Sequence, residues 1–234
     1  MEFFFDSLKE AFLLIVRLNP DILYISWTSL WITSVSCLLA TLFGLSVALI
    51  IASNQFKGKR ILITILNTLM ALPTVVVGLL VYSFLSRKGL FGAWDILYTP
   101  YAMIIGQFIL ATPIITAITI STLEGANEKI QKTALTLGAT KFQAVLTMAK
   151  ELHIMILAAV VAGFGKIFSE VGVSMILGGN IRNYTRNITT SIAFETSKGE
   201  FSLALALGLI LLIIAFGINL LFQQLVKIKK NEIL

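Results

Sequence analysis

Residues 27–53 read WTSLWITSVSCLLATLFGLSVALIIAS and contain no charged side chain. An α-helix needs about 20 apolar residues to cross the hydrocarbon core of a bilayer, and this run is longer. A helix also satisfies its backbone hydrogen bonds within its own segment, which lipid requires. The run therefore predicts a transmembrane helix.

Four more apolar runs follow along the chain, and they predict spans at 61–85, 101–123, 152–177 and 201–226. Pro73 and Pro113 lie within two of these runs, where proline can kink a helix. Charged residues make up 13% of the chain, against about 25% in soluble domains. The sequence thus predicts an all-α membrane protein with about five transmembrane helices in one domain over 27–226.

The two ends of the chain are more polar than the spans. Residues 1–26 mix apolar and charged side chains, which predicts an N-terminal helix lying in the membrane interface, with a short sixth span as the alternative. Residues 227–234 contain three lysines and form a basic tail. Because cytoplasmic segments carry the excess of Lys and Arg, this tail and the polar segment 124–151 are expected in the cytoplasm.

The charge and the reactive residues exclude several functional classes. The net charge of +6 is spread over the segments between spans, so the sequence does not predict nucleic-acid binding. His153 and Cys37 are the only residues of their types, and no metal site or other cofactor site is expected. No phosphate-binding loop and no cluster of catalytic groups occurs, so the chain is not predicted to be an enzyme.

Residues 124–151 form the one long polar segment between spans. Apolar residues recur there with helical spacing, which predicts two short amphipathic helices joined at 137–139. Gly138 suits the left-handed position that ends the first helix. Such a segment in a polytopic protein is typical of a docking site for a partner.

This segment resembles the coupling loop of ABC importer permeases, whose pattern is Glu-Ala-Ala, three residues, then Gly. Ala134 and Gly138 match, whereas Lys132 and Thr133 replace the Glu and the first Ala. The resemblance implies that a set of residues contacts an ATPase: Lys132, Thr133, Ala134, Leu135, Leu137, Gly138, Ala139 and Phe142.

Three other stretches are similar to molybdate and tungstate permeases. Residues 72–80 (LPTVVVGLL) and 169–174 (SEVGVS) resemble molybdate permease motifs, and 178–190 (GGNIRNYTRNITT) resembles the tungstate branch most. The resemblance implies the type I ABC importer fold in a bacterial or archaeal cytoplasmic membrane. It also implies a homodimer, two separate ATPase subunits and an external protein that binds tungstate or molybdate.

The polar residues in and near the last two spans are candidates for the path. Glu170 and Lys166 are the only acid and base well inside a predicted span, and their spacing lets them pair on one helix face. Glu170 is expected either to shape a gate or to have a structural role, through an internal ion pair or a hydrogen bond to a neighbouring helix. The gate and pathway candidates are Pro73, Glu170, Gly172, Asn180 and Thr185.

Arg182 and Arg186 make the segment 178–200 cationic, and this segment is expected to be an external loop. Its positive charge could guide an oxyanion, contact a binding protein or simply be solvated.

These observations predict the permease subunit of a binding-protein-dependent oxyanion importer, with tungstate as the first substrate and molybdate as the second. Permeases for sulfate, phosphate or amino acids are alternatives. A secondary transporter coupled to ions is an alternative from another class, but it is expected to show inverted repeats and several intramembrane acids.

Overall fold

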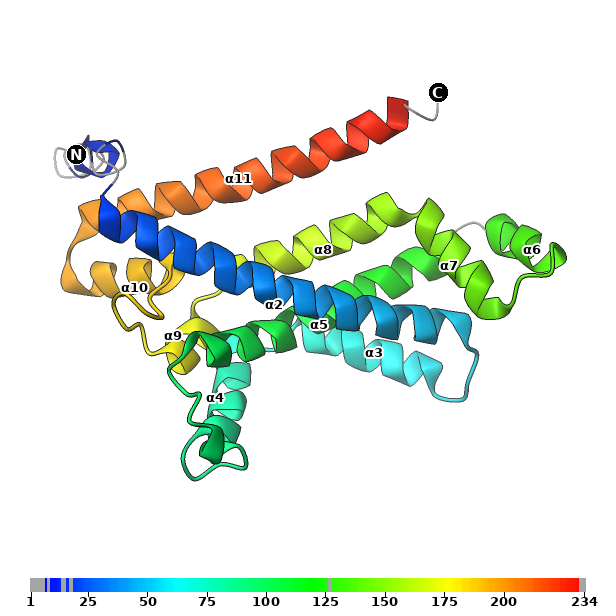
Figure 1. Cartoon of the computed structure of the whole chain (residues 1–234), viewed down its shortest axis with the longest axis horizontal. Coiled ribbons are helices and arrows are strands. Elements are labelled where there is room, and N and C mark those ends of the chain that lie inside the picture. Colours follow the sequence, from blue (N-terminus) through cyan, green and yellow to red (C-terminus); the bar gives the residue numbers. More distant parts are fainter. Residues whose placement is uncertain (1–6, 8, 14–15, 17–18, 126–127, 232–234) are drawn as a thin grey trace.

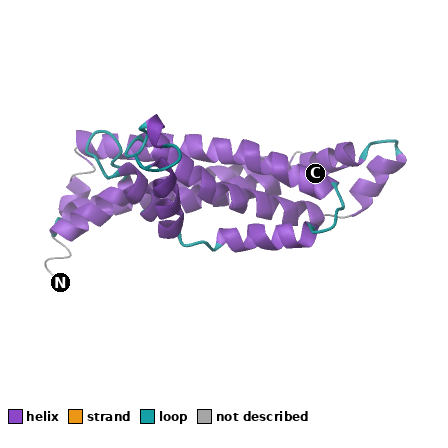
Figure 2. Cartoon of the chain, turned by 90° about the horizontal axis from the view of Figure 1, so that it is seen from below, coloured by secondary structure: helices purple, strands orange, loops and turns teal. Residues whose placement is uncertain are grey.

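A computed structural model of the chain describes residues 7, 9–13, 16, 19–125 and 128–231, and these residues contain helices and no strand. Figure 2 shows that helices make up most of this part of the chain. The elements in chain order are α2 (Pro20–Ser53), α3 (Lys59–Met70), α4 (Thr74–Leu85), the 3-10 turn η1 (Gly92–Trp94), α5 (Pro100–Glu124), α6 (Glu128–Thr136), α7 (Lys141–Glu151), α8 (His153–Phe168), α9 (Gly172–Gly178), α10 (Ile188–Lys198) and α11 (Phe201–Asn231).

The long helices α2, α5, α8 and α11 run along the long axis of the molecule (Figure 1). The helices α6 and α7 lie at one end of this bundle, and α10 lies at the other (Figure 1). Three of the described helices, α2, α5 and α11, are long and apolar enough to cross a membrane. Two bent pairs, α3 with α4 and α7 with α8, bring the number of candidate spans up to five. The prediction of about five spans agrees with this range.

The first span begins earlier than its apolar run indicates. α2 starts at Pro20 rather than near residue 27, because the side chain of Asn19 accepts a hydrogen bond from the Asp21 N–H at 2.9 Å. Proline is favoured at the first helical position, where its missing N–H costs nothing. Residues 20–26 therefore continue α2, while much of the interfacial helix predicted for 1–26 lies outside the described residues and stays a prediction.

The predicted span 61–85 is not one straight helix. It is divided into α3 and α4, which meet at an angle of 99°. Pro73 starts the second helix: its carbonyl accepts from the N–H of Val76 at 3.0 Å, and proline itself offers no N–H to continue α3. As a result α4 projects sideways from the bundle (Figure 1).

The predicted span 152–177 is interrupted as well. α8 ends at Phe168, residues 169–171 are not helical in the same run, and α9 begins at Gly172. The hydroxyl of Ser169 donates to the carbonyl of Gly165 at 2.9 Å, and the carboxylate of Glu170 accepts from the N–H of Gly172 at 2.7 Å. Side chains that bond nearby backbone in this way compete with helix continuation.

The segment 178–200, predicted to be a loop, contains the helix α10. Asn187 caps it: its side chain accepts from the N–H of Thr190 at 2.9 Å, and the hydroxyl of Thr190 accepts from the N–H of Asn187 at 3.1 Å. This reciprocal pair satisfies two N–H groups that a helix start leaves free. The segment 178–200 therefore contains a helix with its own cap.

α5 is the central helix of the bundle. Its most apolar window is 72% buried, against 33% for α2 and 17% for α11. Glycines allow close approach to it: a Cβ on Gly163 of α8 would lie 2.8 Å from Ile115, and one on Gly44 of α2 would lie 3.0 Å from Thr116. α11 leaves most of its apolar surface uncovered by this chain.

Candidate coupling surface and translocation path

The joint between α6 and α7 has the geometry that the sequence predicts. Gly138 has φ +90°, and its N–H donates to the carbonyl of Leu135 at 3.0 Å. The N–H of Ala139 donates to the carbonyl of Ala134 at 3.0 Å, which closes the end of α6. Thr140 then caps α7 through a reciprocal pair with Gln143. These hydrogen bonds fix where α6 ends and where α7 begins.

One face of this helix pair is packed, and another is open. Val145 and Met148 of α7 are buried against Leu123 of α5. In contrast, Leu137 at the joint is 83% exposed and Phe142 is 49% exposed. These exposed apolar side chains make the joint a candidate contact site for another protein.

The other predicted coupling residues lie around the same joint. Two alanines are half-buried, Ala134 and Ala139. The rest are exposed, namely Lys132, Thr133, Leu135 and Gly138. The structure therefore presents all eight predicted coupling residues on or beside one joint.

An ion pair stands next to the coupling segment. The ammonium of Lys59, the first residue of α3, lies 3.0 Å from the carboxylate of Glu124, the last residue of α5. The same ammonium donates to the carbonyl of Asn54, just after α2, at 3.3 Å. A cation is favoured where helix C-termini meet, because the helix dipoles are negative there. Glu124 is distant from Lys59 in the sequence, so no local spacing predicts this ion pair.

The two breaks in the predicted spans meet in space. α4 packs on α9, and a Cβ on Gly172 would lie 3.0 Å from Val75 and 3.2 Å from the hydroxyl of Thr74. Thr74 follows Pro73 directly, so the break at 71–73 lies beside the break at 169–171. Two of the predicted gate residues, Pro73 and Gly172, are thereby brought to one place.

Glu170 lies at the centre of this contact and is buried. Besides the bond from its carboxylate to Gly172, its backbone carbonyl accepts from the hydroxyl of Thr189 at 2.9 Å, which links the break to α10. The helical pair of Glu170 with Lys166 that the sequence suggested is wrong. α8 ends at Phe168, and within the described residues no ion pair joins these two side chains.

Asn180 and Thr185 form hydrogen bonds within the segment 178–200. The hydroxyl of Thr185 is buried, accepts from the N–H of Ile181 at 3.0 Å and donates to the carbonyl of Gly178. Asn180 has φ +51°, and its carbonyl accepts from the guanidinium of Arg186 at 3.4 Å. These bonds shape the turn between α9 and α10.

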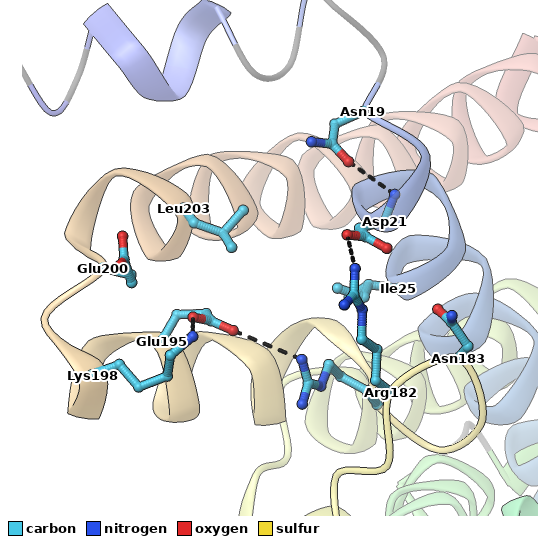
Figure 3. A pocket seen from close by; sticks show the side chains of 10 residues that line it. Asn19, Asp21, Ile25, Arg182, Asn183, Glu195, Lys198, Glu200 and Leu203 are labelled. Carbon is cyan, nitrogen blue, oxygen red and sulfur yellow. Dashed lines mark hydrogen bonds and ion pairs between the residues drawn. The ribbon is translucent and has the colours of Figure 1, made fainter.

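A cavity of about 280 Å³ opens where this segment meets the starts of α2 and α11. Arg182 reaches across to Asp21 at 2.6 Å, and Glu195 of α10 holds Lys198 at 2.6 Å (Figure 3). Glu195 also lies 3.8 Å from the guanidinium of Arg186. The cations that sequence analysis considered for guiding an oxyanion are therefore balanced by carboxylates. Glu195 is buried. Its pair with Lys198 has the i, i+3 spacing of neighbours on one helix face, whereas Arg186 precedes the helix and has no such spacing to Glu195.

Comparison with known proteins gives the chain its family. Residues 40–228 match the model of the family described as binding-protein-dependent transport system inner membrane component. The chain is 37% identical over 225 residues to the tungstate uptake system permease protein TupB of Peptoclostridium acidaminophilum, covering 96% of this chain and 99% of that protein. It is 38% identical over 225 residues to the TupB protein of Campylobacter jejuni, covering 96% and 94% of the two chains.

A solved structure shares the fold. The chain superposes on a chain of the inward-facing MetNI methionine ABC transporter with a TM-score of 0.73 at 18% identity, covering 90% of this chain and 97% of the other. This likeness agrees with the predicted type I importer architecture. The chain therefore belongs to the family of binding-protein-dependent transport system inner membrane components, and it is an all-α, multi-pass protein of the cytoplasmic membrane.

Proposed function

We propose that this chain is the permease subunit of a tungstate importer and forms the path by which the oxyanion crosses the membrane. The observation that carries the proposal is the similarity to two tungstate permeases over 96% of the chain. Such coverage includes the coupling segment, both breaks and the segment 178–200. It supports a shared substrate more strongly than a match confined to the coupling segment would.

In this proposal the chain works as a homodimer with two ATPase subunits and an external protein that binds tungstate or molybdate. The exposed apolar residues Leu137 and Phe142 dock the ATPase. The permease itself hydrolyses no ATP, and all the chemical work is done by the partner.

Movement of the ATPase subunits reaches the path through packed helices. α7 contacts α5 through Val145 and Met148, and α5 in turn packs on α9. A displacement of the coupling segment therefore acts on the place where α4 and α9 meet. Rigid-body motion of this kind alternately opens the two sides of a transporter.

The gate is proposed at the contact of the two breaks, with Pro73, Glu170 and Gly172 as its residues. Short polar bonds, rather than continuous helix, hold the chain there. Asn180 and Thr185 act at the outer end by fixing the turn that the substrate passes.

Elemental analysis tests the substrate. Cells with and without the gene are grown with trace tungstate, trace molybdate and excess sulfate, and a strain with the gene restored serves as the control. A selective loss of cellular tungsten supports the proposal. A loss of cellular molybdenum alone would agree with the proposed architecture but would identify molybdate as the substrate. Unchanged contents of both metals would contradict an oxyanion importer of this kind.

A further inference from the structure

Lys166 is a cation deep within the membrane-spanning part of the chain. It lies in the last turn of α8, which starts at His153 beside the coupling segment. At 1.5 Å per residue, Lys166 stands about 20 Å along the helix axis from His153. An ammonium at that depth is costly, and such residues face protein or a water-filled cavity rather than lipid.

The side chain of Lys166 is exposed on this chain, and within the described residues it forms no ion pair or hydrogen bond through its ammonium. The buried residues of α8, namely Ala159, Gly163 and Ile167, lie on the side of the helix next to Lys166, so Lys166 stands at the edge of the packed face. The intramembrane acid Glu170 is turned inward and bonded to Gly172. Lys166 therefore has no counter-ion within the described part of this chain.

The surroundings of Lys166 differ from those of a lipid-facing helix. α11 exposes bulky side chains, with Leu212 at 67% and Phe216 at 65%. The exposed neighbours of Lys166 on α8 are small, namely Ala162, Gly165 and Ser169, and a Cβ on Gly165 would meet open space. These small residues leave space beside α8: Gly165 and Ser169 line a cavity of about 160 Å³ between α8 and α11, together with Leu212.

We propose that Lys166 is an anion-binding residue of the translocation path, and that two copies of the chain place their ammonium groups around one tetrahedral dianion. This inference rests on the proposed function, which supplies both the dimer and the oxyanion. Two ammonium groups balance the two negative charges of the substrate, so that neither partner is left uncompensated where the dielectric is low.

A lysine suits the passage of an anion better than a residue that holds the anion tightly in one orientation. Its ammonium is a point charge on a flexible stem and donates in several directions, so it holds no fixed orientation of a tetrahedral anion. A path requires binding that is favourable enough for entry and weak enough for exit. Specificity among oxyanions is then left to the external binding protein.

The test measures tungstate uptake in cells that express the complete importer with Lys166→Met, Lys166→Gln or Lys166→Arg. Lys88→Met, in the exposed segment after α4, is the matched control for loss of one lysine. Uptake is recorded against tungstate concentration, together with the amount of assembled complex and its ATP hydrolysis without substrate.

Both neutral variants are expected to lose at least about tenfold in uptake per unit tungstate concentration, because a hydrogen bond to a charged group is lost in each copy. Lys166→Arg keeps most of the uptake, and assembly and unstimulated ATP hydrolysis stay normal. If the importer with Lys166→Met does not accumulate in the cells, the uptake measured with Lys166→Gln decides the outcome.

Two results would overturn the inference. One is uptake by both neutral variants within twofold of the unmodified importer. The other is a smaller amount of assembled complex whose half-saturating tungstate concentration is unchanged. That result would mean that Lys166 stabilises the complex, through an ion pair with a lipid phosphate or with the second copy of the chain, and does not bind the substrate. Absence of uptake by the unmodified importer is a separate result, and it refutes the proposed function together with this inference.

Discussion

Replacing Glu124 by Gln is expected to destabilise the chain more than replacing Lys59 by Met, although each change removes the same ion pair. The reason is the difference in burial of the two partners. The side chain of Lys59 is 10% exposed, whereas that of Glu124 is 43% exposed. Glu124→Gln leaves a buried ammonium whose remaining acceptor is the carbonyl of Asn54 at 3.3 Å. Lys59→Met leaves a carboxylate that water can reach.

The magnitudes follow from this geometry. Two charges 3.0 Å apart attract by about 5 kcal/mol at an effective dielectric constant of about 20, but loss of hydration offsets most of it. Breaking a buried pair from one side costs about 3–5 kcal/mol, and the exposure of Glu124 and the bond to Asn54 lower this to about 2 kcal/mol for Glu124→Gln. Lys59→Met should cost about 1 kcal/mol or less, since its partner becomes hydrated.

The assay is equilibrium unfolding of the purified permease in mixed micelles, followed by circular dichroism, for both single variants and the double variant. The double variant should be nearly as stable as Lys59→Met, because no buried charge is left unpaired in it. Equal losses from the two single variants, or a larger loss from Lys59→Met, would refute the reasoning from burial.

Two other changes probe packing and docking. Gly106→Ala should cost about 1–3 kcal/mol of unfolding free energy, because its Cβ would lie 2.4 Å from Val173. The control is Gly165→Ala, whose Cβ would meet open space and which should change stability little in the same unfolding assay. Similar losses of stability from the two variants would contradict the packing account. Gly138→Glu should abolish co-purification with the ATPase while membrane insertion stays normal, since a side chain at φ +90° strains the joint and adds a charge to the docking surface. Normal co-purification of Gly138→Glu would remove the joint from the docking site.

The span pattern could be predicted because it depends on local composition. Runs of apolar residues determined where α5 and α11 lie, and Gly138 marked the joint of the coupling segment. The bend at Pro73 had a local signal, but its angle of 99° did not, because the direction of α4 is set by its packing on α9. Helix α10 was missed since its residues are polar and its start is capped by Asn187 with Thr190 rather than by the usual Ser or Thr with Glu or Gln.

The break at 169–171 shows why the candidate site was harder to predict than the fold. No proline or strong turn signal marks it in Ser169-Glu170-Val171. It depends on Thr189, which is distant in sequence and donates to the carbonyl of Glu170. In a continuous helix, Glu170 and Lys166 would lie on one face and could form an ion pair. Because the helix is broken, they form no such pair, and Lys166 has no counter-ion within the described chain.

α5 offers a physical route from the proposed coupling segment, residues 124–151, to the proposed gate. At the end of α5 beside the coupling segment, Leu123 packs on α7 and Glu124 holds the start of α3. Near its other end, Gly106 lies against α9, so closely that a Cβ there would clash with Val173. Close-packed interiors transmit strain rather than absorb it. A shift of α7 should therefore move α5 and α3 together, and the polar break beside Glu170 is where the chain can yield.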